Sequence, residues 1–419
     1  MSAPEVFQLS LGPLTGIAFS PDRSQVCVCP NSNEAQIYTR NGDSWDLTDT
    51  LAEHDKLITA IAWGPNTNRI VTCSQDRNAY VWTQTEQGWK PALVILKINR
   101  AATSVKWSPA ENKFAVGSGS RVIAICHFDE ENNWWTAKQI KKPLRSTVLS
   151  LDWHPNNYLL AAGTADGKVY VYSGYIKGLE SKPEATIWGD RLPTGQLLAE
   201  FRSPNGGWIH DVAFSPSGDA LAFVAHDSSV NIIYASGPNE PPAAHIVVKL
   251  PALPFTSLTW TSESSIVAAG HDCQPILFSG SSSGWSLSNS LDDPSSSGSK
   301  PLTPSATGVR SGGVGRLGNN EAFNMFKAAD SKGQRSVSQP GAGGSSSTAS
   351  TGLTQVGQDG LLLTVHQNTI THVEAYEWNQ NGDVSKIFTA GRDGRLVIWP
   401  VTSGGSKGGL AGRMAGLQV

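Results

Sequence analysis

The side chains best suited to acid–base chemistry in this chain are histidines and aspartates that lie near tight turns. His54 and Asp76 form one such combination, and His366 and Asp393 form another. A His–Asp pair can act as a general base, but only with a nucleophile or substrate within reach. The alternative is a structural hydrogen-bond network within a sheet, and we favour it. The residues assigned to this network are His54, Asp76, Asp166, Asp393, Trp82 and Trp399.

Other signals of catalysis or of cofactor binding are absent from the sequence. There is no phosphate-binding glycine loop and no G-x-S-x-G elbow, and we interpret residues 117–120 (GSGS) as a turn. The five cysteines are odd in number and match no zinc spacing, so we expect buried thiols on strands. We therefore predict a protein that is not an enzyme, with no cofactor and no metal site.

An aromatic residue that stands two positions before a proline recurs along the chain. The five instances are Phe19/Pro21, Trp63/Pro65, Trp107/Pro109, Trp153/Pro155 and Phe214/Pro216, and Trp260 follows with Ser262 in the place of the proline. The intervals between successive aromatics are 44, 44, 46, 61 and 46 residues. A period near 45 with short alternating strands is typical of the blades of a β-propeller.

Turn and strand signals extend this count to seven blades. Asp-Gly between β-rich runs, as at 166–167 and 393–394, predicts hairpins with type I′ turns. A seventh repeat runs from Ile370 to Trp399 and lacks a fourth strand. We expect residues 6–9 (VFQL) to supply that strand and to join the two ends of the chain. The predicted fold class is an all-β, seven-bladed propeller.

Composition suggests one large folded unit that a long insert interrupts. We place blades 1–6 and the closing strand in residues 1–291, the insert in 292–356, blade 7 in 357–400 and a flexible tail in 401–419. Hydrophobic residues make up 39% of the chain and charged residues 16%, which suits turn-rich β-structure. The net charge of −3 does not favour nucleic acid. No apolar run is long enough to span a membrane, so we expect a cytoplasmic protein.

Several segments go beyond what blade geometry demands, and they resemble a known family. They are residues 70–83 (IVTCSQDRNAYVWT), 89–109, 112–126 (NKFAVGSGSRVIAIC), 140–157, 174–201 and 266–278. These stretches closely resemble the WD-repeat subunit of the actin-related protein 2/3 complex, which nucleates branched actin filaments. The chain departs from that family in its longer, Ser/Gly-rich insert. It also departs at the WD dipeptide, since Thr83 follows Trp82 and Pro400 follows Trp399.

The resemblance implies a seven-bladed WD40 β-propeller and a set of partners. The partners would be the other six subunits of the complex, the actin filament and the acidic tails of nucleation-promoting factors. The protein would then be a non-catalytic structural and regulatory subunit of the actin cytoskeleton, located in cortical actin patches. The alternative is a stand-alone propeller adaptor that binds short peptides on its top face. The segments 89–109 and 174–201 favour the first hypothesis.

The insert is rich in Ser, Gly, Thr and Pro, so we expect most of it to be disordered. One island, residues 319–330 (NNEAFNMFKAAD), has the spacing of a short amphipathic helix. Its apolar stripe is Ala322, Phe323, Met325, Phe326 and Ala329. This helix could fold back on its own propeller. The resemblance implies instead that it contacts the mother actin filament.

A basic group lies between the third and fourth repeats. Its members are Arg121, Lys138, Lys141, Lys142 and Arg145. An isolated charge run is usually a solvated loop, but the resemblance implies a site for acidic partners, which such a group would attract. Trp134 and Trp135 could pack an aromatic residue of that partner, or they could pack within the outer strand of blade three.

Overall fold

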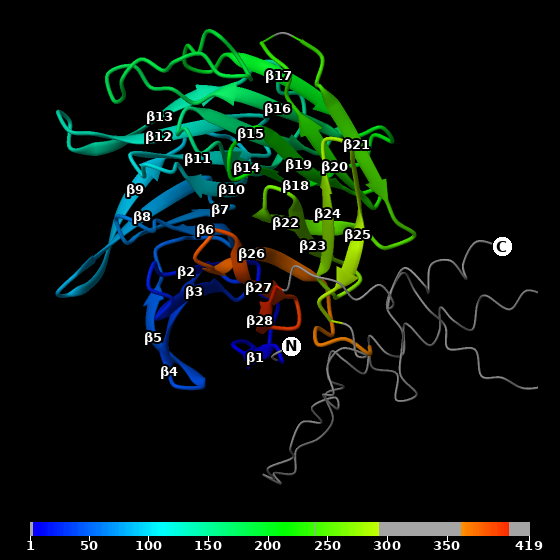
Figure 1. Cartoon of the computed structure of the whole chain (residues 1–419). Helices are drawn as coiled ribbons and strands as arrows, with labels where there is room; N and C mark the ends of the chain where they lie inside the picture. The colour runs from blue at the N-terminus through cyan, green and yellow to red at the C-terminus, as the bar shows by residue number, and fades with distance from the viewer. Residues whose placement is uncertain (1–2, 239, 293–361, 402–419) are drawn as a thin grey trace, which may run out of the picture.

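Seven antiparallel sheets of four strands each form a ring in the computed structural model, which describes residues 3–238, 240–292 and 362–401 (Figure 1). The described residues contain 28 strands and no helix. Within these ranges, accordingly, no helix has the length and apolar character needed to cross a membrane. The seven-bladed all-β propeller predicted from the repeat period is confirmed.

The strands of each blade follow the chain from the ring axis outward. Blade 1 contains β2 (Gly16–Phe19), β3 (Gln25–Cys29), β4 (Ala35–Asn41) and β5 (Ser44–Leu51). Blade 2 contains β6 (Ile58–Trp63), β7 (Arg69–Ser74), β8 (Asn78–Thr85) and β9 (Gly88–Ile95). Blade 3 contains β10 (Ala102–Trp107), β11 (Lys113–Ser118), β12 (Ile123–Asp129) and β13 (Trp134–Ile140). Blade 4 contains β14 (Val148–Trp153), β15 (Leu159–Thr164), β16 (Lys168–Ser173) and β17 (Leu197–Arg202).

The remaining three blades follow the same order until the last. Blade 5 contains β18 (Ile209–Phe214), β19 (Ala220–Ala225), β20 (Ser229–Tyr234) and β21 (Ala244–Lys249). Blade 6 contains β22 (Phe255–Ser262), β23 (Ser265–Gly270), β24 (Ile276–Ser281) and β25 (Gly284–Ser290). Blade 7 contains β26 (Ile370–Trp378), β27 (Val384–Gly391), β28 (Arg395–Pro400) and the N-terminal strand β1 (Glu5–Gln8).

Burial explains the composition of the second strand in each blade. Both faces of such a strand pack against neighbouring blades, so it is apolar along its whole length instead of alternating. All six residues of β11 (KFAVGS) and of β15 (LLAAGT) are buried. The outer strands have one or both faces open, and there exposed and half-buried residues alternate, as in β21.

Hairpin turns between the second and third strands differ from the sequence prediction. A type I′ turn needs positive φ at both central residues. In the Asp-Gly turns only the glycine has positive φ, at 75° for both Gly167 and Gly394, and its N–H bonds back to Thr164 or Gly391. This is a three-residue connection, a type I turn followed by a left-handed residue. Arg77 occupies the same position with φ of 76°.

The N-terminal strand closes the ring by pairing with the last strand. β1 runs antiparallel to β28, with Val6 opposite Val397 and Phe7 opposite Leu396. Beyond the strand, the backbone N–H of Leu9 donates to the carbonyl of Gly394 at 3.1 Å. Val6 and Val397, 391 positions apart in the sequence, therefore share one sheet, and β28 has no open edge.

Hydrogen bonds between neighbouring inner strands fix the blades against each other. The hydroxyl of Thr59 donates to the carbonyl of Ala102 in the next blade at 3.0 Å. Equivalent bonds run from Thr103 to Val148, from Thr256 to Ile370 and from Thr371 to Leu14. The recurring first-strand aromatic adds to this, since the Trp153 Nε1–H donates to the carbonyl of Lys106 at 3.1 Å.

The cysteines are buried as expected, but one of them is not on a strand. All five are buried, and Cys273 lies in the turn between β23 and β24 with φ of 59°. It holds the left-handed turn position that glycine holds in blades 4 and 7. Burial raises the pKa of Cys73 to about 12, which keeps this thiol protonated and poorly reactive.

Deletion of residues 1–10 should lower the melting temperature and accelerate unfolding, because it exposes the edge of β28 and removes Phe7 and Leu9 from the core between blades 7 and 1. Differential scanning calorimetry and unfolding kinetics measure both effects. Leu11→Ser, at a fully exposed position in the same segment, is the matched control and should behave as the wild type. Unchanged stability of the truncated protein would contradict closure by β1.

Candidate functional site

The His–Asp combinations form buried networks in blades 2 and 7. His54 lies in the loop before β6, and its Nδ1 is 2.7 Å from the Asp76 carboxylate. Its Nε2 is 2.9 Å from the Thr72 hydroxyl, to which the indole N–H of Trp82 also donates at 3.0 Å. The structure therefore joins His54, Asp76 and Trp82 through Thr72, a residue that the sequence analysis missed.

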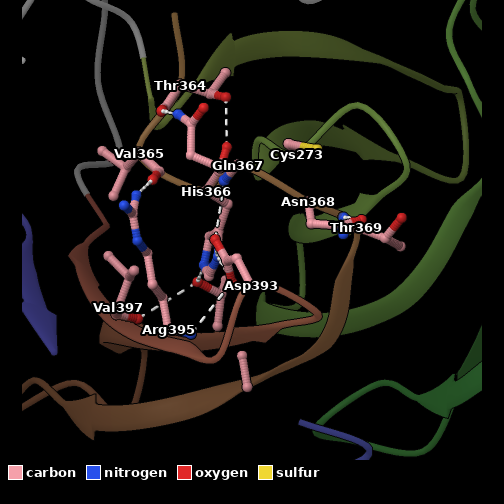
Figure 2. Close-up of polar contacts among 12 residues, drawn as sticks. Cys273, Thr364, Val365, His366, Gln367, Asn368, Thr369, Asp393, Arg395 and Val397 are labelled. Atoms are coloured by element: carbon pink, nitrogen blue, oxygen red, sulfur yellow. Dashed lines mark hydrogen bonds and ion pairs between the residues drawn. The ribbon is translucent and has the colours of Figure 1, made fainter. Parts of the chain in front are cut away.

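Blade 7 repeats the arrangement. Figure 2 shows His366 beside Asp393, with Nδ1 and a carboxylate oxygen 3.0 Å apart. The other ring nitrogen of His366 is 2.8 Å from the Thr389 hydroxyl, and Trp399 donates to that hydroxyl at 2.8 Å. Asp393 also accepts the backbone N–H of Gln367. The carboxylate thus ties the loop before the blade to a turn within it.

The chemistry of these groups fixes the direction of each bond. An ionised carboxylate only accepts, so Nδ1 of His54 carries the proton and Nε2 accepts from the Thr72 hydroxyl. The hydroxyl can then accept from the indole of Trp82, and every polar atom has a partner while the imidazole is neutral. Burial lowers the pKa of His54 below its usual value, and Asp76 offsets this only in part. The network is a structural support, and the side chain of His54 is fully buried.

Asp166 does not join such a network. Its carboxylate accepts the Thr164 hydroxyl at 2.6 Å. Leu144 stands four residues before β14, which is the place that His54 holds before β6, and it packs in the core with Ala162 and Tyr172. Blade 4 therefore replaces the polar network with apolar contacts. The Asp-Gly turn alone could not reveal this, because its partner comes from a distant loop.

Four members of the basic group lie at one edge of blade 3. Arg121 is in the turn between β11 and β12, while Lys141, Lys142 and Arg145 follow β13. In an antiparallel sheet these two connections leave from the same end, which we call the top face. Lys138 lies within β13 opposite Ile125. All five side chains are exposed, and none forms an ion pair with another described residue.

Two further cations belong to this top face, and the sequence analysis missed them. Lys97 and Arg100 are exposed in the loop between β9 and β10. The Ser120 hydroxyl accepts the backbone N–H of Arg100 at 2.9 Å, and the Gln139 amide donates to the carbonyl of Lys97 at 3.0 Å. These bonds hold the β9–β10 loop against the β11–β12 turn and against the end of β13, from which the third loop continues. Residues 96–102, 118–123 and 138–148 contain no acidic side chain, so no carboxylate within these segments offsets their positive charge.

The tryptophan pair is placed away from this cationic face. Trp134 begins β13 and the basic loop follows its end, so the two lie at opposite ends of the strand. Trp135 packs edge-on against Trp107 and Phe128 at 5.9 and 5.7 Å between ring centroids. Trp134 is 63% exposed. Trp135 therefore has the structural packing role, and neither indole borders the basic loops.

The predicted actin-contacting helix lies in a part of the chain that the structure does not describe. The apolar stripe of residues 319–330 lies outside the described residues, and so do most of the insert and the tail. Within the described ranges, no group of three or more His, Cys, Asp or Glu side chains is arranged to hold a metal ion.

Comparison with known proteins first defines the class. Residues 45–83, 138–173 and 358–400 match the WD40 family model, described as "WD domain, G-beta repeat". The first two matches start in the outer strand of one blade and end in the third strand of the next, from β5 to β8 and from β13 to β16. The sequence repeat thus begins one strand earlier than the blade, and for this reason the last blade lacks its fourth strand at the C-terminal end. The chain is a WD40-repeat β-propeller.

Relatives then define the family. "Actin-related protein 2/3 complex subunit 1" of Schizosaccharomyces pombe is 45% identical over 95% of this chain and 100% of its own length. Subunit 1A-B of Xenopus laevis is 44% identical, over 94% and 95% of the two chains. The Saccharomyces cerevisiae subunit 1 is 38% identical, over 96% and 98%. The chain belongs to the family of actin-related protein 2/3 complex subunit 1.

His54→Leu should lower the free energy of unfolding by about 2 kcal/mol at pH 7 to 8, because the buried Asp76 carboxylate loses its imidazole donor and the Thr72 hydroxyl loses its acceptor. The folded-state pKa of His54 is depressed, so its contribution is complete above the unfolded pKa of about 6.5 and is lost as pH falls toward the folded value. The difference in the free energy of unfolding between wild type and variant should therefore become smaller from pH 7 to pH 5. Urea denaturation at several pH values measures this difference. A difference that does not change with pH would contradict the assignment of His54 as a buried, neutral member of the network.

Proposed function

We propose that this chain is a non-catalytic structural and regulatory subunit of the actin-related protein 2/3 complex that supports nucleation of branched actin filaments. Family membership supports its place in that assembly. Both His–Asp combinations are used in buried networks, so they do not offer a base to a substrate. The propeller instead offers loops at fixed positions around a closed ring, which suits partner binding.

The first proposed partner is the acidic tails of nucleation-promoting factors, which would bind to the cationic top face. Six exposed cations lie in three loops at this face, namely Lys97, Arg100, Arg121, Lys141, Lys142 and Arg145, and Lys138 continues the charge along β13. Hydrogen bonds connect the first of these loops to the second and to the end of β13. Fixed loops keep these charges in place, so binding costs less ordering. An acidic segment would be attracted over a distance and would bind by screened, exposed contacts.

The mother actin filament is the second proposed partner. We place this contact at the amphipathic island of residues 319–330, on its sequence pattern alone. Phe323, Met325 and Phe326 would give the contact its apolar area. A helix of this length is weakly stable alone in water, so the contact would act mainly by adding avidity to the whole complex.

Charge reversal at Lys141, Lys142 and Arg145 to Glu should weaken binding of an acidic tail about tenfold at low salt and less at high salt, because exposed charge contacts are individually small and screened. Fluorescence anisotropy of a labelled tail on the assembled complex, across a salt series, measures the effect. The matched control reverses Lys90, Lys177 and Lys182, which are exposed away from the top loops. Equal affinity of wild type and variant at every salt concentration would support the solvated-loop interpretation instead.

Phe323→Ala with Phe326→Ala should leave the propeller folded and the complex assembled, but branch formation on preformed filaments should fall. The reason is loss of the two largest apolar side chains of the island. Phe323→Leu with Phe326→Leu keeps apolar side chains and should retain most of the activity, as seen by fluorescence microscopy of branches. If the alanine variant instead destabilises the isolated chain by more than about 1–2 kcal/mol, the island packs on its own propeller.

A further inference from the structure

The outer strand of blade 2 exposes two large aliphatic side chains that no described residue covers. Leu93 is 48% exposed and Ile95 is 59% exposed on β9. Both belong to the segment 89–109, whose sequence blade geometry does not require. Clustered aliphatic groups on an exposed edge strand invite association, so a protein that retains them usually covers them with a partner.

Register shows which way these side chains face. Side chains alternate along a strand, so Leu93 and Ile95 share a face with Trp89, which packs edge-on against Trp63 at 5.5 Å. That face looks toward blade 1, whereas Val94 packs in the core shared with blade 3. Tyr80 stands opposite Leu93 in the sheet and is half-buried beside it. The three side chains form a continuous apolar strip.

Carboxylates from blade 1 border this strip. Asp49 pairs with Ile37 on the β5 face that looks toward blade 2. Glu53 and Asp55 are exposed in the loop that follows β5. His54, between them in the sequence, packs edge-on against Tyr80 with 4.8 Å between ring centroids, so the loop that carries both carboxylates lies beside Tyr80. None of the three acids forms an ion pair with a described residue.

The outer strands β5 and β9 lie at the rim of the ring (Figure 1). Between blades 2 and 3 the outer segments are joined, because Gln139 donates to the carbonyls of Leu96 and Lys97. Among the described residues no hydrogen bond joins β5 to β9. Pro91 lacks an N–H, so an added strand could not pair fully along the edge of β9. An occupant must therefore bind through side chains.

We propose that this rim surface, formed by Tyr80, Leu93, Ile95, Asp49, Glu53 and Asp55, docks a basic amphipathic segment of another protein. Two apolar side chains of that segment would cover Leu93 and Ile95, which stand about 7 Å apart along the strand. That spacing approaches the distance between helix positions three or four apart. Lysine or arginine beside them would face the carboxylates of blade 1. The carboxylates of the rim surface lie on the blade 1 side of blade 2, whereas hydrogen bonds tie the loop of Lys97 and Arg100 to blade 3, so this surface selects a different partner from the cationic top face.

Site-specific photo-crosslinking in the full-length protein in its native assembly tests this proposal. A benzophenone amino acid replaces Leu93, and a matched probe replaces Val247, which is 39% exposed on the outer strand of blade 5. Mass spectrometry of the Leu93 crosslinks should identify another polypeptide, at an apolar residue within one helical turn of Lys or Arg. Crosslinks only to this chain, whether to its own insert or to a second copy, or no crosslink at all, would overturn the proposal.

Charge reversal tests whether the carboxylates of blade 1 contribute to docking. Asp49→Lys with Glu53→Lys should lower the crosslink yield at Leu93 about tenfold, because it places cations against a basic segment. Glu130→Lys with Glu131→Lys, exposed at the β12–β13 turn, is the matched control and should leave the yield unchanged. Circular dichroism melting shows that each variant is folded. A yield that Asp49→Lys with Glu53→Lys does not change would overturn the charge complementarity on which the choice of partner rests.

Discussion

Pairing of β1 with β28 is the constraint on which the rest of this structure depends. A ring of separate sheets has no covalent closure, so the last blade must take its fourth strand from the first residues of the chain. Once that strand is in place, each blade has a neighbour on both sides and each second strand is buried on both faces. The bonds from Thr59, Thr103, Thr256 and Thr371 to the following blade then tie the sheets together at four of the seven junctions.

Rigidity gives the loops their functional value. In blades 2 and 7 the buried His–Asp–Thr–Trp networks fix the loop before the blade to a turn within it. In blade 3 the Ser120 hydroxyl and the Gln139 amide fix the β9–β10 loop, which carries Lys97 and Arg100. The His–Asp combinations, which could have been acid–base groups, thus hold loops in place. Two surfaces of opposite charge, the top face and the rim surface, follow from this use of the fold.

Much of the fold could be predicted from the sequence, because the aromatic–x–proline spacing and the strand alternation are local signals. The bounds of β6 and β14 follow from them, and so does the strand missing after Trp399. The turn type could not be predicted, since Asp-Gly suits both a type I′ turn and a type I turn followed by a left-handed glycine.

The candidate sites were harder to predict from the sequence than the fold, because their residues come from different loops. Leu144 in place of a histidine isolates Asp166. Arg100 comes close to the turn of Arg121 only through its bond to Ser120, which the sequence does not reveal.

The central claim, that this propeller works as a subunit of the actin-related protein 2/3 complex, has a direct test. The measurement is affinity purification of the tagged chain at native expression level from its own organism, followed by size-exclusion chromatography and quantitative mass spectrometry. Our account predicts that the chain elutes with the six other subunits of the complex in equal amounts. A monodisperse monomer, free of those subunits, would contradict the account and would favour a stand-alone propeller adaptor.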